Sequence, residues 1–138
     1  MEARGTHIIC ELSGCDRTLL SDLGRVRTIM VVAAREANAE VLKVAFHRFE
    51  PHGVSGVVVI AESHLSIHTW PESGYAAVDF YTCGDHTDPW RACEYAARHL
   101  GASTMLTTEV KRGIASTNGR YTHVVHEHAG QAMVKRSA

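Results

Sequence analysis

Three kinds of reactive side chain gather in two short segments of the sequence. Residues 62–72 read ESHLSIHTWPE, and residues 79–85 read DFYTCGD. A serine hydroxyl is a weak nucleophile that needs a base and donors for the oxyanion. An imidazole can move protons near neutral pH, and a thiol with an ordinary pKa of about 8.5 is still protonated there. The segments therefore offer a nucleophile, a proton shuttle and a proton donor, although each residue alone also fits an ordinary strand or a packed thiol.

The elements that would position these side chains are mostly strands. β-Branched and alternating residues predict strands at residues 6–12, 41–49, 54–60, 64–69, 75–82 and 104–110. Turns with Pro and Gly at residues 51–53 and 70–74 separate consecutive strands. Short connections of this kind imply antiparallel pairing.

Two helices are expected to cover this sheet. Residues 16–37 carry apolar side chains at three- and four-residue steps, and a second helix begins at Asp88-Pro89 and ends at Gly101. The sequence therefore predicts an α+β fold, a two-layer sandwich with an antiparallel β-sheet and helices packed on one face. After Ile114 no periodicity stands out, so we expect one domain at residues 1–113 and a tail of unknown role at residues 114–138.

Composition favours a soluble protein with a small partner. The formal net charge is −1, which leaves no strongly basic field for nucleic acid or an anionic membrane. The first residues lack the apolar stretch of a signal peptide, and the longest apolar runs are too short to cross a bilayer, so we expect a cytoplasmic protein. The four cysteines form no CxxC pair and are expected to be free thiols.

Together with residues 51–56, PHGVSG, the two reactive segments resemble the bacterial and archaeal S-adenosylmethionine decarboxylase proenzymes over about residues 5–113. The resemblance implies self-cleavage between Glu62 and Ser63 into a 1–62 β chain and a 63–138 α chain. Ser63 would become a pyruvoyl group that forms a Schiff base with the substrate amine and accepts the electrons freed by decarboxylation. No external cofactor is then expected. The product would be the aminopropyl donor for spermidine biosynthesis.

The resemblance also assigns roles to side chains around the junction. Ser63 attacks the preceding carbonyl, Ser55 stabilises the tetrahedral intermediate, and His68 moves the protons that drive elimination. Cys83 would donate a proton to the substrate α-carbon after carbon dioxide leaves. Cys93, on the apolar face of a predicted helix, is expected in the core.

Substrate binding is implied at three further positions. In the family an aromatic pair holds the adenine and an acidic residue binds the ribose hydroxyls, and Phe49, Trp70 and Glu72 occupy these positions. Apart from the resemblance, the two aromatic residues would be read as core and Glu72 as a solvated charge. Ser73 and the Phe80-Tyr81 pair are less usual for the family.

Alternative functions remain open at this point. Relatives with the same processing residues decarboxylate arginine or ornithine. The ten histidines suggest a metal-binding or regulatory protein, but His64 and His68 would lie about 13 Å apart along a strand. His123, His126 and His128 lack cysteine partners at zinc spacing, so we expect no metal. An unprocessed regulatory homologue is a third possibility. The family likeness implies a homodimer, with residues of both subunits in each site.

Overall fold

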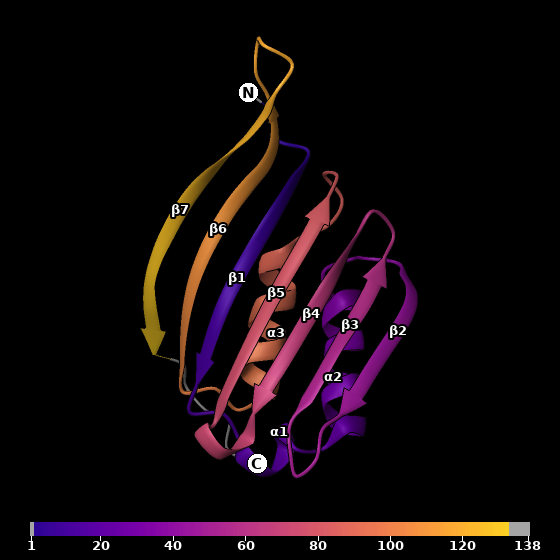
Figure 1. Ribbon diagram of the computed structural model, residues 1–138, viewed down its shortest axis with the longest axis vertical. Coiled ribbons are helices and arrows are strands. Elements are labelled where there is room, and N and C mark those ends of the chain that lie inside the picture. Colours follow the sequence, from indigo (N-terminus) through magenta and orange to yellow (C-terminus); the bar gives the residue numbers. More distant parts are fainter. Residues whose placement is uncertain (1, 133–138) are drawn as a thin grey trace.

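The computed structural model describes residues 2–132, which form one antiparallel sheet with helices on one face (Figure 1). The sheet has seven strands in the order β2-β3-β4-β5-β1-β6-β7. Their bounds are Gly5–Ser13 (β1), Val41–Arg48 (β2), Val54–Ile60 (β3), Ser63–Trp70 (β4), Tyr75–Cys83 (β5), Thr104–Ala115 (β6) and Tyr121–Ala132 (β7). This confirms the expected fold class.

The helices all pack against the same side of the sheet (Figure 1). They are α1 (Arg17–Leu20), α2 (Leu23–Glu36) and α3 (Pro89–His99), and a short 3₁₀ turn, η1 (Pro71–Ser73), joins β4 to β5. Asp88 caps α3 by accepting a hydrogen bond from the Trp90 amide. No helix in residues 2–132 is long and apolar enough to cross a membrane.

The expected helix at residues 16–37 is two helices, and the reason is a second cap. Asp16 caps α1, but the Asp22 carboxylate accepts a hydrogen bond from the Arg25 amide and starts α2. An aspartate that satisfies a free helix amide defines a new helix start. The apolar periodicity continues across this break, so it did not indicate the interruption.

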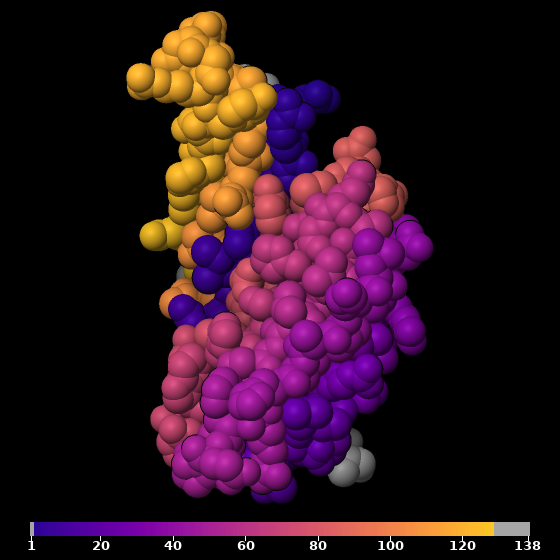
Figure 2. All heavy atoms as spheres, turned by 45° about the vertical axis from the view of Figure 1, so that its right-hand side comes forward, coloured from indigo at the N-terminus to yellow at the C-terminus, as the bar shows by residue number. Residues whose placement is uncertain are grey.

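The end of the chain differs more from expectation. β6 continues past residue 110 to Ala115, and the segment that carried no recognised pattern contributes β7, which pairs with β6 along its length. The register of this pair shifts twice, between Met105 and Thr107 and between Arg112 and Ile114. Such shifts break the two-residue alternation that identifies a strand. The β6–β7 hairpin projects beyond the other strands (Figures 1 and 2).

Strand alternation divides the sheet into a buried face and an open face. Leu65 and Ile67 of β4 and Phe80 of β5 are fully buried beneath the helices. Residues between them point the other way, where the described chain provides no cover. The central strands thus present to the open face the polar side chains His64, Ser66, His68, Asp79 and Tyr81. The site residues are therefore carried on a rigid surface.

Candidate active site

A pocket of about 430 Å³ lies where β3 begins and β4 runs into η1. It brings together five of the side chains singled out from the sequence. They are Phe49, Ser55, His68, Trp70 and Glu72. The turn at Gly53 forms part of its wall. One substrate-sized hollow therefore contains all three expected substrate-binding residues and two of the expected processing residues.

The aromatic residues of this pocket are not core residues. Phe49 is 47% exposed and Trp70 is 41% exposed. The Trp70 ring stacks on Tyr75 with 5.1 Å between ring centroids, and the Tyr75 hydroxyl donates a hydrogen bond to Glu11. One face of the indole is thus covered by a tethered partner. The exposed aromatic surface of Phe49 and Trp70 can stack on a planar ligand.

The polar residues of the pocket come in two pairs. Ser55 and His68 are opposite each other on β3 and β4, and Ser55 Oγ lies 2.7 Å from His68 Nδ1. Glu72 lies 3.2 Å from His52 Nε2, a neighbour that the sequence had not indicated. Ser55 and His68 can exchange a proton, or Ser55 can fix the tautomer of the His68 imidazole. The second pair holds a carboxylate acceptor at the rim.

The expected cleavage junction lies at the opposite end of β4. Glu62 occupies the tight hairpin between β3 and β4 with φ +75°, the left-handed conformation that suits glycine and strains a glutamate. Ser63 is the first residue of β4, and Cys83 is the last residue of the adjacent β5. A Glu62 carboxylate oxygen lies 3.3 Å from the ideal Cβ position of Gly84. Glu62, Ser63 and Cys83 therefore form a second group of site residues.

The surroundings of Cys83 keep its thiol protonated. Burial raises the pKa of Cys83, and the nearby Glu62 charge raises it further, against opposing effects of a hydrogen bond from Tyr81 and the charge of Arg112. A thiol with a raised pKa is suited to give a proton rather than to attack as a thiolate. Cys93, by contrast, is fully buried, as expected for a core residue.

The two groups of site residues are far apart within one chain. Ser63 and His68 are five residues apart on one continuous strand, a separation of about 17 Å at the usual rise of a β-strand. The alternation of β4 also directs Ser63 toward the helix side, whereas His68 belongs to the open face. His68 of the same chain therefore does not reach the junction in this conformation.

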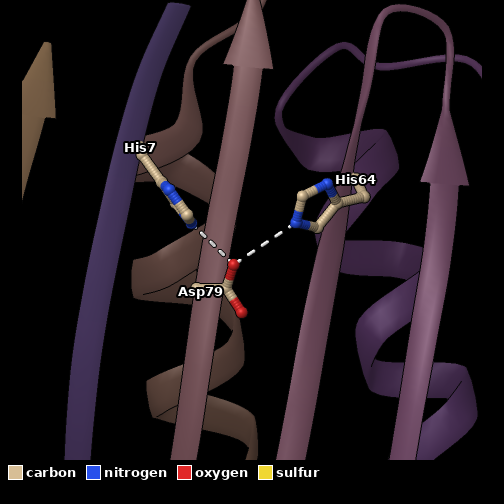
Figure 3. A group of neighbouring side chains, drawn as sticks. All are labelled: His7, His64 and Asp79. Atoms are coloured by element: carbon tan, nitrogen blue, oxygen red, sulfur yellow. Dashed lines mark hydrogen bonds and ion pairs between the residues drawn. The ribbon is translucent and has the colours of Figure 1, made fainter. Parts of the chain in front are cut away.

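A third cluster lies between these groups, on the open face (Figure 3). His7 Nε2 lies 2.6 Å and His64 Nε2 lies 3.5 Å from Asp79 Oδ2. Ser66 donates a hydrogen bond to the other Asp79 oxygen, and Arg112 lies 3.2 Å from His7 Nδ1. Burial raises the pKa of Asp79, but the hydrogen bonds from His7 and Ser66 and the two histidine charges outweigh it, so the pKa is lowered. The carboxylate is thus ionised at neutral pH.

Sequence reasoning did not bring this cluster together. Asp79 stood in a recognised segment without a role, and His7 had none. The order β4-β5-β1 carries the three side chains to neighbouring positions. Alternation could have placed Asp79 on the same face as Tyr81. Only the pairing of β1 with β5, two strands far apart in sequence, supplies His7.

Known proteins match both the sequence and the fold. Residues 6–113 match the family described as S-adenosylmethionine decarboxylase. The chain is 61% identical to the S-adenosylmethionine decarboxylase proenzyme of Caldicellulosiruptor saccharolyticus and 60% identical to that of Caldanaerobacter subterraneus subsp. tengcongensis, in each case over 83% of this chain and 92% of the relative. The crystal structure of the adenosylmethionine decarboxylase from Aquifex aeolicus VF5 superposes with a TM-score of 0.71 at 33% identity, covering 100% of this chain and 98% of the other. The chain belongs to the S-adenosylmethionine decarboxylase family.

Proposed function

We propose that this chain is a self-processing decarboxylase of S-adenosylmethionine that makes its own pyruvoyl group from Ser63. The observation that carries this proposal is the position of Glu62 and Ser63. Glu62 is the second residue of the two-residue turn between β3 and β4, in a strained left-handed conformation, and Ser63 follows it directly. The turn lies beside Cys83, the thiol whose pKa is raised. A left-handed glutamate costs on the order of 1 kcal/mol, and cleavage of its peptide bond would release that strain. The family identity supports the same reading.

Processing would proceed at this hairpin. The Ser63 hydroxyl adds to the Glu62 carbonyl, and the carbon–nitrogen bond breaks to leave an ester. Removal of the Ser63 α-proton then expels the Glu62 carboxylate, and addition of water with loss of ammonia leaves the carbonyl group at residue 63. These steps need donors for the oxyanion and a base, the roles that we assign to Ser55 and His68.

In turnover, the pyruvoyl carbonyl would act as the electron sink for decarboxylation. The chain itself would bind and orient the substrate and supply the proton. Cys83 would deliver that proton to the substrate α-carbon, for which its raised pKa is suitable. Cleavage would also make residue 63 the first residue of its fragment. The group at residue 63 would then no longer have to point toward the helix side, as it does within the continuous strand.

The separation within one chain supports an active site shared by two copies. Cys83 and the junction lie at one end of the central strands, whereas Ser55 and His68 lie at the other. A two-fold axis that lies above the open face, parallel to the sheet and perpendicular to the strands, exchanges these ends. With the axis midway between residues 63 and 68 of β4, the open faces of two chains meet. The junction of each then lies over the Ser55–His68 pair of the other.

The open face has the composition that such contact needs. Along with its polar cluster it exposes apolar side chains on four strands, namely Ile9, Val59, Leu106 and Val125. Exposed apolar groups on an otherwise uncovered sheet are stabilised by burial against a second sheet. We therefore assign this face to a homodimer with two equivalent sites.

Substrate recognition would use the pocket of Phe49, Trp70 and Glu72. Exposed aromatic surface fits an adenine, and the half-exposed carboxylate of Glu72 fits ribose hydroxyls. The alternative substrates arginine and ornithine offer neither a planar ring system nor a ribose. The pocket presents one carboxylate, already paired with His52, for a cationic side chain. It therefore favours the nucleoside substrate.

Two measurements test the proposed function. Intact mass should show fragments 1–62 and 63–138 for the native sequence, with a carbonyl at residue 63, and a single uncut chain for Ser63→Ala. Release of carbon dioxide should then be measured from S-adenosylmethionine, arginine and ornithine. A native chain that stays whole on long incubation contradicts self-processing. Turnover of an amino acid alone contradicts the substrate assignment and leaves processing intact.

A further inference from the structure

His7, His64 and Asp79 bring three potential ligand atoms within 4.8 Å of one another on the open face of the sheet. The side chains come from β1, β4 and β5 and point toward one another (Figure 3). Each is partly buried within the single chain, so the donors are held by the sheet and are not covered by other described parts of the same chain. Two imidazole nitrogens and one carboxylate oxygen are the donor set that zinc and related divalent ions accept.

Two of the three ligand distances are already close to those around an ion, and the two imidazole nitrogens lie within 4.8 Å of each other. Ligands at about 2.0–2.1 Å around a tetrahedral ion are about 3.3 Å from one another. His64 Nε2 and Asp79 Oδ2 are already 3.5 Å apart, and the 2.6 Å separation of His7 Nε2 from the same oxygen has to widen by a fraction of an ångström. Rotation of the imidazole rings provides this movement without a change in the strands.

Neighbouring side chains favour metal binding by the Asp79 carboxylate but oppose metal binding by His7. Ser66 donates to Asp79 Oδ1 and so leaves Oδ2 directed at the two imidazoles. A metal-bound His7 would carry its proton on Nδ1, which then cannot accept the hydrogen bond offered by Arg112. Arg112 is exposed and also lies over the Tyr81 ring, 4.7 Å from its centroid, so it can leave His7 and keep that contact. Arg112 and the ion therefore compete.

We propose that His7, His64 and Asp79 form a binding site for a divalent transition-metal ion of the zinc type, with Arg112 as a competing cation. Three protein ligands leave one tetrahedral position for water, which in the proposed dimer lies in the layer between the two sheets. The bound ion links β1, β4 and β5. This departs from the expectation of no metal, which considered His64 with His68 and the histidines at 123, 126 and 128, each within one segment of the chain. The site is separate from the proposed pyruvoyl chemistry and requires no turnover.

Binding is best measured on the full-length Ser63→Ala chain, so that every variant has the same uncut backbone. After removal of metals with a chelator, titration calorimetry with zinc chloride should give one ion per chain. His7→Gln, His64→Gln and Asp79→Asn should each weaken binding by about tenfold or more. Arg112→Met should strengthen it several-fold. The control is a His123→Gln/His126→Gln double variant, which removes two β7 histidines and should bind as before.

A direct view of the ion provides the second measurement. Crystals of the full-length chain soaked in zinc chloride should give anomalous density between the two imidazoles and the Asp79 carboxylate. Density elsewhere, or binding that is lost in the β7 double variant and unchanged in the three ligand variants, would overturn the proposal. Weaker binding in Arg112→Met would contradict the competition. None of these outcomes depends on self-cleavage or decarboxylation.

Discussion

Cys83 and Cys93 have opposite environments although both are free thiols. Cys83 ends a strand beside Glu62 and Arg112, whereas Cys93 is sealed between α3 and the sheet, with its sulfur 3.4 Å from that of Met105. A proton donor has to meet the substrate, so only Cys83 can serve. The position of Cys83 at a strand end, and not the residue type, therefore distinguishes the proposed proton donor from the buried Cys93.

We expect Cys83→Ala to cut normally at Ser63 but to lose most decarboxylation or to divert turnover to abortive transamination, because the carbanion is protonated by the wrong donor. Cys93→Ala is the matched control and should lose only core packing, within the usual range of about 1–3 kcal/mol or less. Product analysis by chromatography and thermal unfolding check the two effects. Equal turnover of both variants and the native chain would move the proton donor elsewhere.

The alkaline side of the pH profile should report the same thiol. Its pKa is raised by burial and by the Glu62 charge, so the proton-donating form persists at neutral pH and is lost as pH rises through the raised pKa. The rate of decarboxylation should therefore fall on the alkaline side. Arg112→Gln removes a charge that lowers this pKa and should move the fall to higher pH. A fall that moves to lower pH would contradict the assignment.

Trp70→Ala should weaken substrate capture by about 5- to 150-fold, because stacking of a base on an aromatic ring contributes on the order of 1–3 kcal/mol. Self-cleavage should be little changed. Glu72→Gln keeps the stacking and should lose less. KM for S-adenosylmethionine, measured beside the fraction of cut chain, separates these effects. An unchanged KM in Trp70→Ala would remove the indole from the binding site.

At the scale of elements, the hairpin of β3 and β4 determines where everything in the site lies. β3 carries Ser55 and β4 carries Ser63, His68 and Trp70, so one strand pair reaches both groups of site residues. Gly56 allows β2 to pair with β3, because the Phe46 side chain of β2 lies directly over Gly56 on the helix side. An ideal Cβ at Gly56 would lie 2.0 Å from the Phe46 ring.

Gly56→Ala should therefore destabilise the protein by about 1–3 kcal/mol, since the rigid ring has to move. Gly56→Ala should cost less in a Phe46→Ala background, because alanine lacks the ring atoms that the new methyl group meets. Denaturant unfolding of the two single variants and the double variant gives the coupling. Additive losses would mean that the clash is relieved in another way.

The sequence predicted the central strands closely but not the parts that depend on long-range pairing. Alternation and turn residues located β3, β4 and β5 within about one residue, and the cap at Asp88 located α3. β7 was missed because register shifts in its pairing with β6 disturb alternation. The separation of Ser63 and His68 was within reach of the sequence, since the strand predicted at residues 64–69 already implies about 17 Å over five residues, but the resemblance had placed both residues in one site.

At the scale of the whole molecule, a site shared by two copies, as proposed, would make defective chains complementary. Ser63→Ala supplies an intact Ser55–His68 pair, and His68→Ala supplies an intact junction. Random pairing of equal amounts gives mixed dimers for about half of the molecules, each with one complete site, so about a quarter of the native activity should return. Coexpression with two affinity tags and an assay of the purified mixed dimer measure this. No recovery in the mixed dimer would contradict the shared site.

If the chain is cut between Glu62 and Ser63 as proposed, the strand order has a further consequence. Fragment 1–62 contributes β1, β2 and β3, and fragment 63–138 contributes the other strands, but β1 is inserted between β5 and β6 and pairs with both. The two pieces are therefore interleaved, and neither can leave without breaking ladders on both sides of β1. After cleavage and complete unfolding, fragments 1–62 and 63–138 would have to meet by diffusion before they can refold. Refolding of the cut protein becomes a second-order reaction that slows on dilution, whereas the first folding of each newly made chain is unimolecular.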